Sequence, residues 1–351
     1  SNPGLVLSYY SATRMPEGVI AQHYTMADNF FHSAFGGSFL NHQFLICACT
    51  PVWNQPLPAS PTFVAKWDPA THTLQDSNLT TMPRPGGTGP LYVVNTSFTQ
   101  NSPHPASVPA DQLLQPIPPT QKTIGDLLTD HNPSIDWKWY SGDWNLALAN
   151  DPRAIGCTPG NATNPSPPEN GECFQFHHQP FAYYARWGTD GSPAKAAHLQ
   201  DEQNFLNDLK NNGLPSVSFI KPVGVTNEHP GYATLLKGQQ HVQALVQALC
   251  ESPYWKDSIV IITYDENGGR WDHVAPPKVD QWGPGTRVPT IVVSPYAKAG
   301  YVDHTQYETT SILSLIEKRF GLSSLGTHDG RANPMLNAFD FDQAPLACRS
   351  T

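Results

Sequence analysis

Charged residues are scarce in this sequence, and long apolar runs are absent. Only 14% of the 351 residues are Asp, Glu, Lys or Arg, and the formal net charge is −9. The chain has no basic stripe, so we do not expect it to bind nucleic acid. No apolar run approaches the roughly 18 residues that a membrane-spanning helix needs, so no transmembrane segment is expected either.

Paired CxxC cysteines are also missing among the six cysteines, which argues against a structural zinc site. Cys157 and Cys173 flank a loop rich in Pro, Gly and Asn. We expect a disulfide between them, which would indicate an oxidising compartment; two free thiols are the alternative. Cys47 and Cys49 lie on one face of an expected strand, and we expect no bond between these two.

Proline, by contrast, is abundant at 35 residues, as are tryptophan (9) and tyrosine (13). The aromatic content is too high for a disordered chain, so the prolines predict long irregular loops on a compact scaffold. Residues 51–121 are rich in such loops, with short strands expected at 57–67 and 91–94. We find no linker that would divide the chain, and we expect one domain over residues 1–351.

The stretch at 259–274 organises the rest of the chain. It begins with a β-branched run and ends in a loop that contains Asp265, Glu266, Asp272 and His273. Such a run predicts a buried parallel strand whose carboxyl end faces a site. Adjacent carboxylates suit a hard divalent cation, which prefers oxygen ligands, whereas an ordinary acidic turn is the alternative. For Asp272 and His273, orienting the loop and a plain structural role are equally open.

Strand and helix patterns alternate along the remaining chain. We expect strands at 44–50, 136–140, 216–222 and 287–295, the last also buried and parallel, and helices at 16–25, 123–128, 198–211, 235–252 and 307–320. This order predicts an α/β sheet with helices on both faces.

A candidate nucleophile ends the GGS segment at Ser38, which has the pattern of a tight turn into a helix. The N–H groups and the positive dipole end of that helix would hold a phosphate beside the serine. A plain N-cap is the alternative for Ser38. The paired His177 and His178, and His229 just past the strand at 216–222, are further site candidates, with packing as their alternative.

Five segments together resemble a known family: FFHSAFGGSFLNHQ, FHHQPF, NEHPGY, ITYDENGGRWDHVAPP and GTRVPTIVVSPYAKAG. In this order they are similar to the bacterial phosphoesterase family of non-haemolytic phospholipases C and AcpA-type acid phosphatases, over about residues 5–320. The GGSFLNH segment resembles the acid-phosphatase branch. The resemblance implies an alkaline-phosphatase-like three-layer α/β/α sandwich with a mostly parallel central sheet and long Pro-rich loops, in a periplasmic or secreted bacterial protein.

The resemblance also implies roles for particular residues. The catalytic set would be the nucleophile Ser38 with His177, His178 and His229 around the phosphate. The metal-binding set would be Asp265, Glu266 and Ser38, around one divalent ion that the residues leave open between Ca, Mg, Mn, Zn and Fe. The family's ENRSFD-like opening motif, whose Glu and Asn complete the site, does not occur here. We therefore expect either a separate N-terminal polypeptide of the same precursor as a partner or a truncated chain.

The resemblance thus predicts a metal-dependent acid phosphatase that hydrolyses small phosphomonoesters through a phosphoserine. An acidic optimum is expected if cationic histidines bind the phosphate. The alternatives are a phospholipase C that cleaves phosphodiesters of phospholipids and an inactive phosphate-binding relative. A sulfatase-like enzyme is disfavoured, because Ser38 lacks a C/S-x-P-x-R context.

Overall fold

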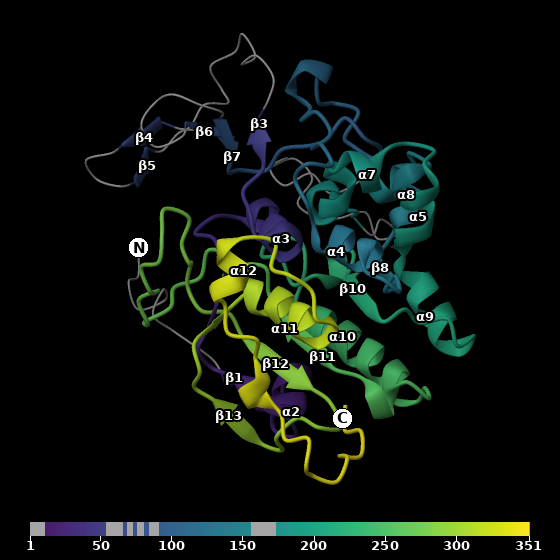
Figure 1. Cartoon of the computed structure of the whole chain (residues 1–351), viewed down its shortest axis with the longest axis vertical. Helices are drawn as coiled ribbons and strands as arrows, with labels where there is room; N and C mark the ends of the chain where they lie inside the picture. Colours follow the sequence, from purple (N-terminus) through teal and green to yellow (C-terminus); the bar gives the residue numbers. More distant parts are fainter. Residues whose placement is uncertain are drawn as a thin grey trace.

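The computed structural model describes residues 11–53, 66–68, 73–75, 81–83, 91–155 and 173–350. Figure 1 shows strands lying between helices, with β3, β6 and β7 near one end of the molecule and β1, β12 and β13 near the other. The longer helices are α2 (Pro16–Ala21), α3 (Ser38–Cys47), α4 (Ile124–Asp130), α8 (Pro193–His198), α9 (Glu202–Lys210), α10 (Leu235–Cys250) and α11 (Thr310–Phe320). Shorter helices are α5 (Trp144–Leu148), α6 (Pro152–Ile155), α7 (Ala185–Gly188) and α12 (Thr327–Arg331).

One sheet contains four strands in the order β11-β12-β1-β13. They are β1 (Thr25–Ala27), β11 (Val260–Thr263), β12 (Thr290–Val293) and β13 (Tyr301–Asp303). β12 pairs antiparallel with both β11 and β1, whereas β1 pairs parallel with β13. β2 (Phe30–Phe31) and β14 (Tyr307–Glu308) form a separate pair of parallel strands.

The expected parallel direction of the strands at 259 and 287–295 is therefore wrong. β11 lies at the edge of the described sheet, and its residues are mostly half-buried. The chain returns from β11 to β12 through residues 264–289 without a helix. Parallel neighbours need a crossover, usually a helix, whereas an antiparallel return does not. An apolar run indicates burial, but it does not indicate the direction of the partner strand.

Helices cover both faces of this sheet, which establishes the predicted α/β fold class. Ile291 and Val293 of β12 pack against α2 and α10, while Val292 between them packs against α11. Successive strand residues point to opposite faces, so a strand covered on both sides is apolar throughout. All four residues of β12 are buried.

A second sheet is wholly parallel, in the order β10-β8-β9. It contains β8 (Trp137–Ser141), β9 (Leu199–Asp201) and β10 (Val217–Lys221). Trp139 packs in the cluster formed with α3, whereas Tyr140 packs against α9 and α10. The expected strands at 136–140 and 216–222 are confirmed. The helix expected at 198–211 is confirmed only from Glu202 to Lys210, because residues 199–201 form β9.

Helix α3 occupies residues 44–47 of the segment 44–50, where we expected a strand. The helix runs from Ser38 to Cys47 and ends at Ala48, whose φ of 49° is left-handed. Nearly every residue of α3 is buried. A helix that is buried on all sides has no amphipathic periodicity, so its short apolar end cannot be distinguished from a buried strand by pattern.

The end of α3 also corrects a cysteine prediction. Cys47 and Cys49 form a disulfide, with Cα atoms 5.1 Å apart. The left-handed turn at Ala48 brings the two Cα atoms within the usual range for a disulfide. A second bond joins Cys250, at the end of α10, to Cys348. The predicted bond from Cys157 to Cys173 involves Cys157, which lies outside the described residues.

The loop-rich region 51–121 is described in part. β3 (Val52–Trp53), β7 (Leu91–Val93) and β6 (Thr81–Pro83) form an antiparallel sheet, and β4 (Lys66–Asp68) pairs with β5 (Thr73–Gln75). The strand expected at 91–94 is confirmed, whereas the one expected at 57–67 lies mostly outside the described residues. None of the helices in the described ranges combines the length and hydropathy needed to cross a bilayer.

Candidate active site

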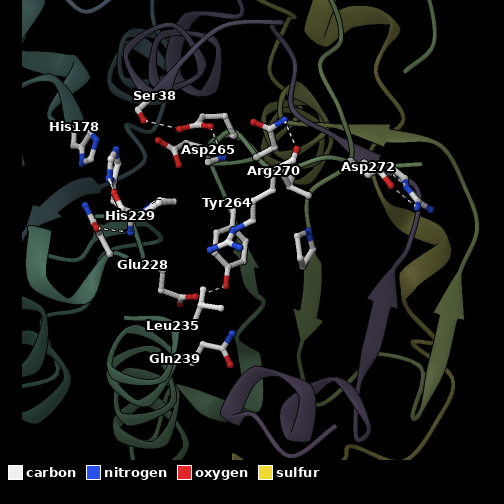
Figure 2. A pocket seen from close by; sticks show the side chains of 18 of the residues that line it. Ser38, His178, Glu228, His229, Leu235, Gln239, Tyr264, Asp265, Arg270 and Asp272 are labelled. Atoms are coloured by element: carbon white, nitrogen blue, oxygen red, sulfur yellow. Dashed lines mark hydrogen bonds and ion pairs between the residues drawn. The ribbon is translucent and has the colours of Figure 1, made fainter. Parts of the chain in front are cut away.

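A cavity of about 270 Å³ lies where the carboxyl ends of β10 and β11 meet the amino end of α3. In Figure 2, Ser38, His178, His229 and Asp265 lie close together in this pocket. The cavity brings together five of the six predicted site residues: Ser38, His178, His229, Asp265 and Glu266. The sixth, His177, does not line the cavity but contacts His178, with ring centroids 4.4 Å apart.

Ser38 is the first residue of α3, and Gly37 is the N-cap. The serine side chain is therefore not used as a cap, and its Oγ donates a hydrogen bond to Glu266 Oε1 at 3.1 Å. The turn before it is fixed by Asn41, whose amide donates to the carbonyls of Ala34, Gly36 and Gly37. The sequence thus places a hydroxyl beside a helix N-terminus, where backbone N–H groups favour an anion.

The acidic loop after β11 places two carboxylates with different proton affinities. Burial alone would raise the pKa of Asp265, but Lys221, His42 and the Ser38 hydroxyl hold it well below its usual range. Burial and the neighbouring Asp265 raise the pKa of Glu266. Glu266 Oε2 also accepts a hydrogen bond from the Gly268 N–H at 2.6 Å. Gly268 has a φ of 59°, a backbone conformation that side chains disfavour, so the glycine shapes this loop.

His178 lines the cavity, and its ring stacks on that of His42 behind it. The rings of His42 and His178 are parallel, with centroids 4.7 Å apart. His42 Nδ1 lies 2.7 Å from the Ser38 carbonyl oxygen and 3.4 Å from Asp265 Oδ2. His178 is 5% exposed, and neither of its ring nitrogens has a hydrogen-bond partner within the described residues.

The buried histidines are neutral at mildly acidic pH, contrary to the expectation that cationic rings receive the phosphate. Burial lowers the pKa of His42 to about 4, with Lys221 adding to the effect. Burial lowers the pKa of His177 to about 3 and that of His178 well below its usual value. A neutral imidazole still carries one N–H, so His178 remains a hydrogen-bond donor without being a cation.

His229 lies past β10, in the loop that follows a short 3₁₀ turn, Gly224–Thr226. Its ring stacks on Tyr232 with centroids 4.3 Å apart, and its Nδ1 lies 2.7 Å from the Pro230 carbonyl oxygen. If Nδ1 donates to that carbonyl, Nε2 is an acceptor in the neutral ring. The ring is thereby held in one orientation at the cavity wall.

Asp272 and His273 separate into different environments. Asp272 forms a two-point ion pair with Arg287, at 2.9 Å and 3.0 Å, which joins the acidic loop to the start of the chain segment leading to β12. His273 is 83% exposed on its side chain. The ion pair of Asp272 with Arg287 thus fixes the position of the acidic loop.

Sequence reasoning missed two residues of the site. His42 lies four residues after Ser38, a spacing that places both on one face of a helix. Lys221 lines the cavity from the last position of β10. A charged residue at the carboxyl end of an apolar strand was the available signal, since ligands bind at that edge of an α/β sheet.

The donor set around Ser38 fits one side of a hard divalent cation. The ionised Asp265, Glu266 and the Ser38 hydroxyl are oxygen donors, which such ions prefer. Asp265 Oδ2 is buried and accepts no hydrogen bond among the described residues. Across the same part of the chain, no cluster of three His, Cys, Asp or Glu side chains is arranged as a complete metal site.

A helix N-terminus, two carboxylates and the unpaired ring of His178 thus meet in one cavity of an α/β protein. The sequence model of the Phosphoesterase family matches residues 1–323. The chain therefore belongs to the phosphoesterase family, as the sequence motifs predicted.

Two relatives are similar to part of this chain. Phospholipase C B of Mycobacterium tuberculosis is 31% identical over 169 residues, which cover 40% of this chain and 32% of the relative. Non-hemolytic phospholipase C of Burkholderia pseudomallei is 36% identical over 140 residues, or 32% and 20% of the two chains. The matched part thus spans a third or less of these relatives.

Among solved structures, a protein of the alkaline phosphatase superfamily from Vibrio parahaemolyticus is similar, with a TM-score of 0.42 and 11% identity. The similarity covers 91% of this chain and 63% of that one. The α/β class itself follows from the sheets and helices described above.

Proposed function

We propose that this protein hydrolyses phosphomonoesters through a covalent phosphoserine on Ser38. The observation that carries the proposal is the position of the Ser38 hydroxyl. It lies at the N-terminus of α3, faces the cavity and is oriented by Glu266 instead of serving as a cap. A phosphate held there meets both the backbone N–H groups of the helix and the serine oxygen.

In the proposed reaction Ser38 Oγ attacks phosphorus in line with the leaving alcohol and gives its proton to Glu266, while the P–O bond to the alcohol breaks and the alcohol leaves with a proton from water. Water then attacks the phosphoserine, which releases inorganic phosphate and returns the proton to Ser38. Glu266 accepts the hydroxyl hydrogen bond and fixes the direction of attack. His178 donates its unpaired N–H to a phosphate oxygen, where charge is concentrated in the transition state. A divalent ion on Asp265, Glu266 and Ser38, when bound, would make the hydroxyl more acidic and draw charge from a phosphate oxygen.

The preference for acidic pH rests on the sequence resemblance alone. Because burial lowers the pKa of His177 and His178, these two rings are not preformed cations in the free protein and do not supply a physical basis for an acid optimum. A bound phosphate dianion would raise histidine pKa values, so we propose that any acidic limb reports the complex with substrate.

A second candidate function is phospholipase C activity on phosphodiesters. Two observations favour it: the relatives above bear that name, and Trp271, which lines the cavity, is 63% exposed. An exposed tryptophan at a cavity mouth suits contact with a lipid surface.

Rates on p-nitrophenyl phosphate, bis-p-nitrophenyl phosphate and phosphatidylcholine vesicles separate the candidates. We expect kcat/KM to be highest for the monoester. Higher activity on the two diesters would favour the phospholipase. Stable binding of inorganic phosphate by the metal-supplemented protein, without turnover of any substrate, would identify an inactive binding relative.

A further inference from the structure

Lys221 is a cavity-lining cation that the proposed reaction does not use. It ends β10, whose alternate residues Val217 and Phe219 are buried in the cluster that includes α3. Because residues two apart on a strand share a face, the Lys221 side chain continues this row toward the site. It lines the cavity and has no hydrogen bond or ion pair to any residue in the described ranges.

The positive charge of Lys221 affects the protonation of the titratable side chains around it. Its positive charge favours the ionised form of Asp265 and disfavours protonation of His42 and His178. His178, 95% buried, also presents ring nitrogens without a partner in the described part of the chain. An unpaired ammonium and an unpaired buried imidazole on one cavity wall form a natural site for an anionic oxygen.

We infer that Lys221 and His178 hold the second anionic oxygen of a phosphomonoester, and that Lys221 thereby determines specificity for monoesters over diesters. The inference rests on the proposed function of the same site. A monoester dianion spreads two negative charges over three non-bridging oxygens, whereas a diester spreads one negative charge over two. Beyond the charge that faces the Ser38 helix, the monoester therefore has a second charge for Lys221, and because the diester lacks it, the ammonium gains little from the diester. A hydrogen bond to a charged group has a selective value of about 10- to 100-fold.

The test is kinetic, with matched variants. In K221M we expect kcat/KM for p-nitrophenyl phosphate to fall about 10- to 100-fold. We expect less than about a threefold fall for bis-p-nitrophenyl phosphate, since the diester lacks the second charge. K221R should retain most of the monoester preference because it keeps the charge. K237M is the control, since Lys237 is an exposed lysine outside the cavity.

Equal losses on both substrates in K221M would overturn the inference, because a structural or metal-positioning role predicts them. Unchanged kcat/KM values for both substrates in K221M would overturn it as well. Thermal unfolding and bound-metal content of K221M, measured beside the kinetics, should match the unmodified protein; if K221M does not fold, K221Q takes its place.

Phosphate binding separates this inference from the proposed function. In titration calorimetry we expect K221M to bind inorganic phosphate about 10-fold or more weakly, with little change for dimethyl phosphate. A protein that hydrolyses neither ester but shows this difference would contradict the phosphatase proposal and still support the Lys221 subsite. A protein that hydrolyses monoesters without any dependence on Lys221 would do the reverse.

Discussion

The Ser38 hydroxyl is not needed to cap α3, because neighbouring residues satisfy the backbone groups at the start of the helix. Gly37 occupies the N-cap, and Asn41 binds the carbonyls of the preceding turn. His42 packs behind the serine, and its Nδ1 lies 2.7 Å from the Ser38 carbonyl oxygen. These residues make Ser38 the best nucleophile candidate of the cavity.

Replacing Ser38 by alanine should therefore abolish turnover while leaving the fold intact. We expect kcat on p-nitrophenyl phosphate to fall by at least about 10³-fold, since the attacking atom is removed. S314A is the matched control: Ser314 also donates one hydrogen bond, at 3.0 Å to the Ala332 carbonyl, but lies on α11. Retention of most of the kcat by S38A would refute the phosphoserine mechanism.

Chelation tests the proposed ion on Asp265 and Glu266. Dialysis against EDTA should lower activity at least about 10-fold, and one of Ca²⁺, Mg²⁺, Mn²⁺, Zn²⁺ or Fe²⁺ should restore it. In D265N the restored activity should require a higher metal concentration, because one anionic ligand is lost. Full activity in a protein shown by elemental analysis to be free of metal would contradict the proposal.

Several of these residues could be predicted from sequence and others could not. Asp265 and Glu266 follow a strong strand pattern, and Ser38 follows a glycine pair, so local sequence places each at the end of an element. Lys221 and His42 carry only weak local marks, a charge at the end of an apolar strand and a spacing of four residues after Ser38. Their meeting depends on α3 and β10 contributing to one hydrophobic cluster, which no single segment reveals.

At the scale of elements, the turn into α3 is the part that positions the nucleophile. Asn41 is completely buried, accepts from the Ala34 N–H at 3.0 Å and donates back to its carbonyl at 3.1 Å. It also contacts the Gly36 and Gly37 carbonyls. The side chain therefore substitutes for the backbone pairing that an irregular turn lacks.

Loss of this side chain should weaken both the fold and the site. For N41A we expect the free energy of unfolding to fall by about 2–3 kcal/mol, because buried backbone groups lose their partners. Denaturant unfolding measures this. N204A on α9 is the control, since Asn204 contacts only a side chain, Gln200. A change in N41A no larger than in N204A would show that the turn is held by other contacts.

Sequence patterns predicted the elements that have one polar face correctly. They gave wrong predictions for elements that are buried on both faces. α10 and α11 have the expected amphipathic patterns and were predicted. The end of α3, within the segment 44–50, is buried on all sides, and its sequence pattern predicts a strand. The direction of β12 was also wrong, because strand direction is a property of the connection.

At the scale of the whole molecule, buried carboxyl pairs join distant segments. Tyr264 OH lies 2.9 Å from Glu17 Oε2 and 2.6 Å from Glu228 Oε2. One hydroxyl proton cannot serve both carboxylates, so a second proton must be shared among the three groups. Burial and then Glu228 raise the pKa of Glu17 to about 8. Burial and then Asp329 raise the pKa of Glu317 to about 8 as well.

These pairs should make the protein more stable in mild acid. A glutamate with a pKa of 4.5 when unfolded and about 8 when folded binds more protons in the folded state. Its contribution is complete below about pH 4.5 and is lost as pH rises through about 8. From pH 5 to pH 8.5 we expect Glu17 to reduce the free energy of unfolding by at least about 2 kcal/mol.

The variant E17Q isolates this effect from the other titrating groups. Glutamine imitates the protonated carboxyl, so the stability of E17Q relative to the unmodified protein should rise between pH 5 and pH 8.5. E251Q, at an exposed glutamate, is the control. Parallel pH profiles of the unmodified protein and E17Q in denaturant unfolding would rule out the shared proton.

The sequence by itself determined the fold class and the family of this protein. Strand runs that end in Asp265, Glu266 and a loop with His229 indicate which edge of the sheet carries a site, and the ordered motifs indicate the phosphoesterase family. Local patterns suffice for this, because strand ends and helix starts are set by nearby residues.

Only the tertiary structure decided which side chains meet. It turned the end of α3 into a disulfide-closed helix, reversed β12 relative to β11, neutralised the buried histidines and placed Lys221 in the same cavity as His178. Each of these outcomes depends on contacts between residues far apart in the chain. Burial and charge in a cavity are sums over all the segments around it, and a linear pattern does not contain that sum.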